Sequence, residues 1–221
     1  QNTKKILDKN YKNLAMLIIE PIQCAVPSEH SIDYLKFLEN YCKKKKIILC
    51  FDEIITGLRV KNLAVFKKYK LKPDMATFAK CFGGGLPIGI TCFNKRIETK
   101  ISKLNKKIFF GGTFSGNPVS TKVGLEAFIK IKKDAQKINI YINKLSEKLE
   151  KEINKFCLSK NIKFKLQRFE SIIRPVFSNE TFRDKFSRNI KDKNFSNSLK
   201  LKKFLIQNNI FISSNCCFFI S

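Results

Sequence analysis

Apolar and polar residues alternate along residues 1–132 in a pattern that predicts strands separated by helices. The run LAMLIIEPI, at 14–22, is almost continuously apolar, as is typical of a strand buried on both faces. Residues 31–46 carry apolar side chains three or four positions apart behind a serine, which predicts an amphipathic helix with an N-cap. The apolar run at 47–54 predicts the next buried strand. This order favours an α/β fold in which a mainly parallel sheet has helices on both faces.

The pattern changes in the middle of the chain. Short apolar segments at 74–80 and 88–94 flank a glycine-rich turn and extend the predicted sheet. Between Pro118 and Cys157 the apolar residues recur every three or four positions, which predicts one long helix. We expect a helix of this kind to connect two domains, the first of them at 1–132.

The remaining residues predict a smaller α+β domain at 133–221. Its elements are expected in the order strand, strand, helix and strand, at 164–169, 171–178, 197–209 and 210–221.

The net charge of the chain excludes fewer classes of function than its large value suggests. The chain has 221 residues with 44 Lys and Arg against 18 Asp and Glu, a formal net charge of +26. The lysines are scattered over the whole chain and arginine is rare, whereas nucleic-acid modules place Arg and aromatic residues at set positions. We therefore expect a solvated cationic surface without a specific nucleic-acid site. A polyanion-binding protein driven by charge alone stays an alternative.

Cysteine usage favours a reducing compartment. Eight cysteines are present, none in a C-x-x-C pair, and several lie in apolar runs where Cys acts as a small hydrophobic residue. With His30 as the single histidine, no metal site is expected. The sequence has no signal-peptide pattern and no apolar run of the ~20 residues that a membrane span needs. We therefore expect a cytoplasmic protein that does not bind membranes.

Two adjacent carboxylates end the predicted strand at 47–54. Asp52 falls at its carboxyl end, which is the edge at which open α/β sheets bind ligands. A carboxylate there is costly unless it is paired with a cation. That cation is either a bound ligand or a nearby side chain such as Arg59.

Lys80 ends the apolar segment 74–80 and stands just before three glycines. Partial desolvation in this setting would favour the neutral amine and free it for attack on a carbonyl. The glycines would let the backbone come close to a bulky group. The alternative is a solvated side chain, in a chain that is rich in lysine.

A second glycine-rich turn, at 109–118, carries hydroxyls at Thr113 and Ser115 and leads into the long helix. Backbone amides, hydroxyls and a helix N-terminus suit a phosphate group. An ordinary loop that ends in a helix cap stays an alternative.

The stretches ILCFDEIITGLR, PDMATFAKCFGGGLPIG and GGTFSGNP, in this order, resemble the class III aminotransferases, a branch of the fold-type I enzymes that use pyridoxal phosphate. The resemblance also includes LIIEPI with the helix after it and, more faintly, the tail, so that it covers most of the chain. The nearest members are glutamate-1-semialdehyde 2,1-aminomutase and its aminotransferase relatives. The family implies a pyridoxal-phosphate-dependent transferase fold, with 1–132 as the C-terminal part of the cofactor-binding large domain.

The resemblance implies roles for four residues. Asp52 matches the aspartate that pairs with the pyridinium nitrogen of the cofactor, and Ile54 matches the small apolar residue packed on one face of the ring. Lys80 matches the lysine that holds the cofactor as a Schiff base and moves protons during the reaction. Thr113 matches a residue that reaches the cofactor phosphate of the neighbouring subunit. That last match implies a homodimer with shared active sites.

The chain departs from the family pattern at places that bear on the substrate. Where family members carry Gly-Asn or a similar pair after EP, this chain has Cys24 and Ala25, and TGLR replaces TGFR. The stretch FESIIRPVF is more similar to relatives that aminate small carbonyl compounds such as sugars. Glu53 is expected to be structural, with Arg59 as a partner.

The hypothesis that follows is transfer of an amino group between small amino and carbonyl compounds, by an aminomutase or a transaminase, through Lys80. In the family, a turn that grips the phosphate and an aromatic residue that stacks on the ring precede the region where this chain begins. Neither occurs in residues 1–13, so we expect a fragment that lacks the N-terminal half. The alternative is a catalytically inactive or incomplete aminotransferase-fold protein that serves as a binding or scaffold protein.

Overall fold

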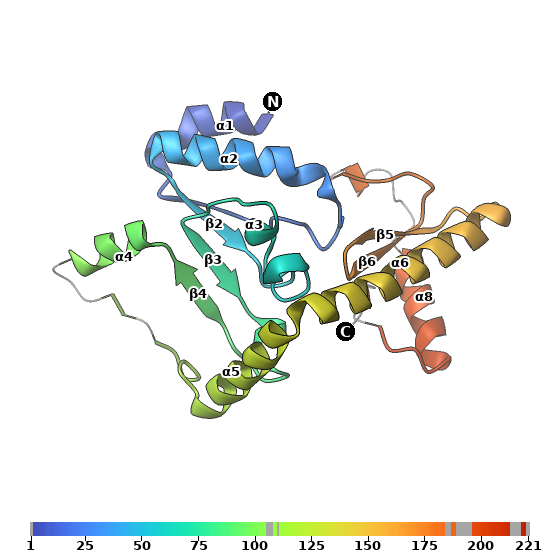
Figure 1. Ribbon diagram of the computed structural model, residues 1–221. Helices are drawn as coiled ribbons and strands as arrows, with labels where there is room; N and C mark the ends of the chain where they lie inside the picture. The colour runs from blue at the N-terminus through green and yellow to red at the C-terminus, as the bar shows by residue number, and fades with distance from the viewer. Residues whose placement is uncertain are drawn as a thin grey trace. The chain divides into compact units, whose positions relative to one another are not determined.

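The chain forms two compact units (Figure 1). The computed structural model describes residues 2–104, 108–109, 111–183, 187–188, 196–212 and 218–219. The first unit comprises Gln1–Pro21, Ile32–Leu58 and Leu63–Lys133, and the second comprises Ile22–Ser31, Arg59–Asn62 and Asp134–Ser221. Two short segments of the second unit thus come from within residues 1–132, and the division into domains 1–132 and 133–221 stays a prediction.

The first unit is built on a four-stranded sheet with the strand order β1-β2-β3-β4. The pairs β1–β2 and β2–β3 are parallel, and β4 runs antiparallel to β3. These strands are β1 Met16–Ile19, β2 Ile48–Asp52, β3 Met75–Phe78 and β4 Ile90–Phe93. The helices are α1 Asn2–Asn10, α2 Ile32–Lys45, α3 Val65–Lys68, α4 Lys95–Ser102 and α5 Pro118–Lys133, with the short turns η1 Tyr11–Asn13 and η4 Lys80–Gly83. The predicted α/β class is confirmed, and the sheet is mixed.

Helix α2 packs against β2 through its apolar stripe. Leu35 and Leu38 of the helix are fully buried, and Leu49 and Phe51 of the strand are almost fully buried. Burial of each such side chain contributes about 1.5–3 kcal/mol to folding. Helix α1 lies beside α2 (Figure 1), where Tyr41 Oη donates a hydrogen bond of 2.9 Å to an oxygen of Asp8.

The other face of this sheet is partly open. Met16 and Ile18 of β1 are 43% and 56% exposed, whereas the alternate residues Leu17 and Ile19 are half-buried. The expectation that the strand at 14–22 is buried on both faces is therefore wrong. A continuous apolar run reports only that both faces are apolar, and what covers each face is decided by tertiary structure.

Asp74 fixes the antiparallel strand β4 to the parallel part of the sheet. Its carboxylate accepts hydrogen bonds from the backbone N–H of Leu49 at 3.1 Å and from Asn94 Nδ2 at 2.9 Å, and Arg96 Nη2 lies 2.6 Å from it. Burial alone would raise the pKa of Asp74, but the hydrogen bonds from Arg96, Leu49 and Asn94 outweigh it, and the pKa lies below its usual value.

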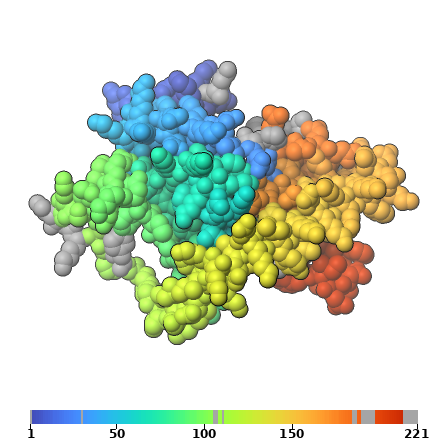
Figure 2. Space-filling model, in the orientation of Figure 1, coloured from blue at the N-terminus to red at the C-terminus, as the bar shows by residue number. Residues whose placement is uncertain are grey.

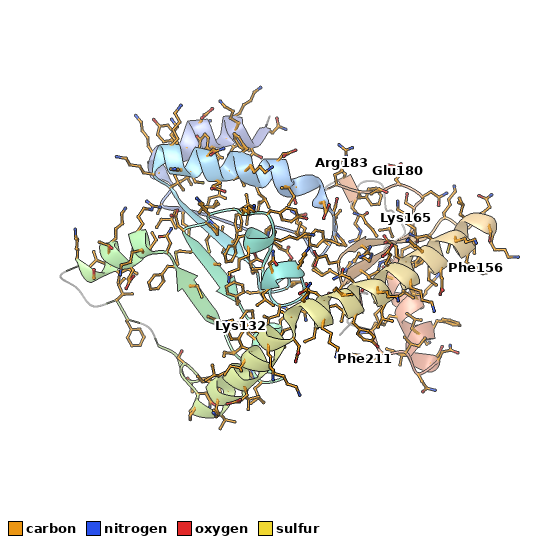
Figure 3. All side chains as sticks on the ribbon, viewed as in Figure 1. Lys132, Phe156, Lys165, Glu180, Arg183 and Phe211 are labelled. Carbon is orange, nitrogen blue, oxygen red and sulfur yellow. The ribbon has the colours of Figure 1, made fainter. Side chains whose placement is uncertain are left out.

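The second unit contains an antiparallel sheet with the order β5-β6-β7. A long helix, α6, packs on β5 through buried residues that include Ile142 and Cys157. The elements are α6 Ala135–Ser159, β5 Lys165–Phe169, β6 Ile172–Val176, α8 Ser196–Gln207 and β7 Phe218–Phe219, with the turns η2 Glu29–Ser31 and η3 Lys61–Leu63. Figure 2 shows α6, in yellow to gold, at the surface. Phe156, near the C-terminal end of this helix in Figure 3, is 55% exposed.

The single helix predicted between Pro118 and Cys157 is wrong. Helix α5 ends at Lys133 and α6 begins at Ala135, with Asp134 outside helical geometry at φ −105° and ψ 16°. Asp is a poor residue for a helix interior and a favoured one at an N-cap position, although here its side chain makes no cap hydrogen bond.

The predicted strand at 210–221 is described only in part. Phe218–Phe219 form β7, while 213–217 and 220–221, with Cys216 and Cys217, lie outside the described residues. Among the helices that the structure describes, none is both long and apolar enough to cross a membrane.

Candidate active site

Asp52 and Lys80 lie at the same edge of the sheet of the first unit. Strands β2 and β3 are parallel, so their carboxyl ends lie together. Asp52 is the last residue of β2, and Lys80 follows the end of β3 and opens the turn η4. The structure therefore brings these two predicted site residues to the one sheet edge at which α/β folds place ligands.

Asp52 is half-buried and makes a local hydrogen bond. Its Oδ1 accepts the backbone N–H of Ile54 at 3.0 Å, which orients the carboxylate at the end of the strand. Ile54, the residue expected to pack on the cofactor ring, is also half-buried and lies just beyond β2. Within the described residues, the Asp52 carboxylate makes this one hydrogen bond.

Lys80 is exposed and has a left-handed backbone conformation, with φ 51°. The expected partial desolvation of its side chain is therefore wrong for the chain as described, because η4 turns at the surface. A non-glycine residue in this region stores of order 1–3 kcal/mol of strain, and such residues cluster at functional sites. No residue pattern around Lys80 indicates this conformation.

Thr77 is a residue of this edge that the sequence did not single out. It is paired in register with Asp52 across β2 and β3, so both side chains lie on one face of the sheet. Its Oγ1 is buried and has no hydrogen-bond partner among the described residues. The sequence feature that could have identified Thr77 is a hydroxyl side chain at a strand position that faces the same side of the sheet as Asp52.

Glu53, next to Asp52, is fully buried and structural. Its carboxylate accepts the backbone N–H groups of Val65 and Phe66, each at 3.0 Å, and the hydroxyl of Thr56. Two of these donors lie in the first turn of α3, whose amides lack helical partners. Burial raises the pKa of Glu53, although the three hydrogen bonds oppose this shift. The sequence predicted a structural role and did not find these partners.

Of the three glycines after Lys80, Gly84 serves helix packing. Gly84 has φ 57°, and a Cβ placed on it would lie 3.0 Å from side-chain atoms of Val123 and Ala127 in α5. A Cβ on Gly124 of α5 would lie 2.6 Å from the carbonyl oxygen of Phe82. The sequence predicted that a bulky group comes close to the backbone at these glycines. At Gly84 this neighbour is helix α5 of the same unit.

Thr113 lines a separate cavity of about 930 Å³. The lining includes Gly112, Thr113, Ser115 and Gly116, and Asn117 at the start of α5. Asn117 Oδ1 accepts the backbone N–H of Ser120 at 3.0 Å, so the loop does end in a helix cap. Among the described residues that line this cavity, neither Asp52 nor Lys80 occurs. The structure thus brings Asp52, Ile54 and Lys80 to one edge and leaves Thr113 apart from them.

The fold and the residues at this sheet edge define the class. The chain belongs to the class III aminotransferase family, whose model, described as "Aminotransferase class-III", matches residues 1–164.

Curated relatives within this family are similar over almost the whole chain. The glutamate-1-semialdehyde 2,1-aminomutase of Methanosphaera stadtmanae is 33% identical over 99% of this chain and 51% of its own length. That of Methanococcus maripaludis is 31% identical over 97% of this chain and 50% of its own length. The chain therefore spans about half the length of the curated relatives that it matches.

Solved structures show the same fold. A β-phenylalanine aminotransferase from Variovorax paradoxus superposes with a TM-score of 0.85 at 18% identity, over 100% of this chain and 50% of its own. A glutamate-1-semialdehyde-aminomutase from Pseudomonas aeruginosa, in complex with PMP, gives a TM-score of 0.78 at 17% identity, over 96% of this chain and 50% of its own.

Proposed function

We propose that this protein moves an amino group between small amino and carbonyl compounds with pyridoxal phosphate as its cofactor, as an aminomutase or a transaminase of class III. The observation that carries the proposal is the convergence of Asp52 and Lys80 on one sheet edge. The membership of the family and the aminomutase names of the relatives support it.

The residues of this edge fit a pyridinium ring. A half-buried carboxylate at Asp52 suits a ring cation, the unpartnered hydroxyl of Thr77 on the same face suits a polar ring substituent, and the exposed amine of Lys80 suits a carbonyl carbon. When bound, pyridoxal phosphate supplies an electron sink that lets an amino group leave one carbon and join another.

Each residue then has a defined task. Asp52 holds the ring nitrogen in its protonated form, and the Ile54 N–H keeps that carboxylate oriented. Ile54 covers one ring face. Lys80 binds the cofactor through Nζ, and the same nitrogen takes and returns a proton at the substrate carbon.

We propose that Thr113 serves the site of a second copy of the chain in a homodimer. Its cavity contains neither Asp52 nor Lys80, and its hydroxyl and neighbouring amides suit a phosphate. Phe109 and Phe114, on either side of Thr113 in sequence, are 88% and 80% exposed, as expected of side chains that a partner covers. Mass measurement by light scattering tests this assembly, and a monomer at micromolar concentration would contradict it.

The setting that we propose is the cytoplasm. Among the described residues, Cys42, Cys50, Cys81, Cys92 and Cys157 are free thiols, which suits a reducing compartment.

Reductive trapping tests the function. The protein in its natural full-length form is mixed with pyridoxal phosphate, reduced with borohydride and mapped by mass spectrometry. We expect the label on Lys80, and we expect Lys80→Ala to lose the visible absorbance of the bound cofactor. Lys70 is a matched control, because it is also exposed and also left-handed, with φ 55°.

Two outcomes would reject the proposal. Equal labelling of Lys70 and Lys80 would show nonspecific reaction with surface lysines. A protein that binds no cofactor at all would favour the binding or scaffold alternative.

A further inference from the structure

A backbone hydrogen bond closes the turn that carries Lys80. The N–H of Phe82 donates to the carbonyl oxygen of Ala79 at 3.2 Å, so that Lys80 is the first of the two residues inside the turn. Its φ of 51° is strained for an L-residue, whereas glycine adopts it freely. Such a conformation persists only where the surrounding structure imposes it. The neighbours of this turn therefore have to hold Lys80 in place.

Aromatic rings hold the turn at both of its ends. The ring of Phe78, the last residue of β3, has its centroid 4.9 Å from that of Phe82. The Phe82 ring also stacks on Phe128 of α5, at 5.7 Å with 18° between the ring planes. The segment 79–81 thus connects two side chains that are in contact. The turn cannot open unless these rings separate, which would cost the attraction between them.

The space around Phe82 is filled on the side of its ring and on the side of its backbone. A Cβ placed on Gly57 would lie 3.0 Å from a ring atom of Phe82 and 2.8 Å from a ring atom of Phe78. A Cβ placed on Gly124 would lie 2.6 Å from the carbonyl oxygen of Phe82. Packing this close leaves no room for a methyl group at either glycine, so it fixes Phe82 in position.

Lys70 is left-handed for a different reason. It has φ 55° and follows the end of α3, where a left-handed residue is common. The N–H of Leu71 returns to the carbonyl oxygen of Phe66 at 2.8 Å, which is the hydrogen bond of a helix C-terminal cap. Lys80 instead follows a strand and has no helix end to explain its conformation.

We infer that Phe82 is a positioning residue for Lys80. Its ring, held between Phe78 and Phe128, imposes the left-handed conformation that sets the direction in which the Lys80 side chain leaves the backbone. A Lys80 that relaxed to negative φ would direct its Nζ elsewhere. The use of this direction rests on the function proposed above, whereas the hold of Phe82 on the turn rests on the contacts alone.

Glycine and alanine at position 80 report the backbone conformation without any cofactor. In the natural full-length protein, we expect Lys80→Gly to have a folding equilibrium constant about fivefold or more above that of Lys80→Ala, because only alanine is strained at positive φ. Urea denaturation measures this glycine preference. We expect Phe82→Leu to abolish it. The same preference at Lys70, from Lys70→Gly and Lys70→Ala, is the matched control and should not change in Phe82→Leu.

Reductive trapping connects the turn to the cofactor. In a brief reaction with pyridoxal phosphate and borohydride, we expect Phe82→Leu to lower the labelling of Lys80 relative to Lys70 by about tenfold, because a misplaced amine reacts slowly. Phe66→Leu is the matched control, since this ring packs on the same core cluster from α3, outside the turn. It should leave the ratio of labelling unchanged.

The outcomes separate this inference from the proposed function. A glycine preference at position 80 that persists in Phe82→Leu would overturn the inference. Unchanged trapping in Phe82→Leu, or an equal loss in Phe66→Leu, would overturn it too. A wild-type protein without label on Lys80 would reject the proposed function instead, and the glycine preference would still test Phe82. Where Phe82→Leu fails to fold, Phe128→Leu removes the opposite ring, and an unchanged glycine preference there would overturn the inference.

Discussion

Asp52 and Thr77 are register partners across the parallel strands β2 and β3, and their side chains share one face of the sheet. One of them is a carboxylate oriented by a backbone N–H, and the other is a buried hydroxyl with no partner among the described residues. A polar pair of this kind contributes little to stability, and at the carboxyl edge of a sheet it would suit the cofactor proposed above.

Thr77→Val should separate stability from cofactor binding. The methyl group has the shape of the hydroxyl and removes an unpaired buried oxygen, so we expect the free energy of unfolding to rise by up to about 1 kcal/mol. We expect the affinity for pyridoxal phosphate to fall several-fold, with Thr77→Ser restoring it. Urea denaturation and spectrophotometric titration measure the two effects. A variant that loses stability would show that the hydroxyl is paired in the native protein.

Glu53→Gln should destabilise the first unit. The carboxylate receives the N–H groups of Val65 and Phe66, and an amide NH₂ in place of one oxygen would face a donor. We expect a loss of roughly 1–3 kcal/mol in the free energy of unfolding, measured by urea denaturation. Glu126→Gln is the control, because this exposed residue pairs, among the residues that the structure describes, with Lys122 along α5 at 2.7 Å, and its loss is expected below ~0.5 kcal/mol. Equal losses would contradict a capping role for Glu53.

Asp74 should contribute to stability at neutral pH and lose that contribution in acid. Its folded-state pKa is lowered, so the unfolded chain binds the proton more readily. The contribution is complete above the unfolded pKa of about 3.9 and disappears as the pH falls through the folded value. Urea midpoints between pH 2 and 6 should therefore fall less steeply in Asp74→Asn than in the wild type. Asp33→Asn, at a side chain that is 98% exposed, should follow the wild-type curve, and parallel curves for Asp74→Asn would refute the prediction.

Gly124→Ala should reverse the usual effect of alanine in a helix. Alanine normally stabilises a helix by about 1 kcal/mol over glycine. Here its Cβ would lie 2.6 Å from the carbonyl oxygen of Phe82, so α5 must move away from η4. We expect a net loss of roughly 1–3 kcal/mol, measured as a lowered Tm. At Gly89 an added Cβ meets no described atom within 4 Å, and Gly89→Ala should change stability by less than ~0.5 kcal/mol.

The sequence predicts the core of the fold and the position of the site residues along it. The strand that ends at Asp52 and the helix after Ser31 are visible because burial imposes a period on the residues of each element. That Asp52 and Lys80 share an edge also follows, since parallel strands end together. The exposure of Ile18 and of Lys80 does not follow, because it depends on what packs over each from elsewhere in the chain.

Backbone conformations and cavities are harder to predict from the sequence. No residue pattern marks the left-handed φ of Lys80 or the break at Asp134, since each is a compromise between local preference and packing. The burial of the Asn139 side-chain oxygen likewise cannot be predicted from the sequence, because the exposed residues of α6 are mostly polar and Asn139 does not differ from them in type.

The open face of β1 has a consequence for the behaviour of this protein in solution. A chain with a net charge of +26 repels its own copies, and this repulsion keeps the exposed Met16 and Ile18 of different molecules apart. Salt shortens the range of that repulsion to about 8 Å at physiological ionic strength and leaves the apolar attraction in place. Colloidal stability should therefore decrease as salt is added, so that this cationic protein is handled best at low ionic strength.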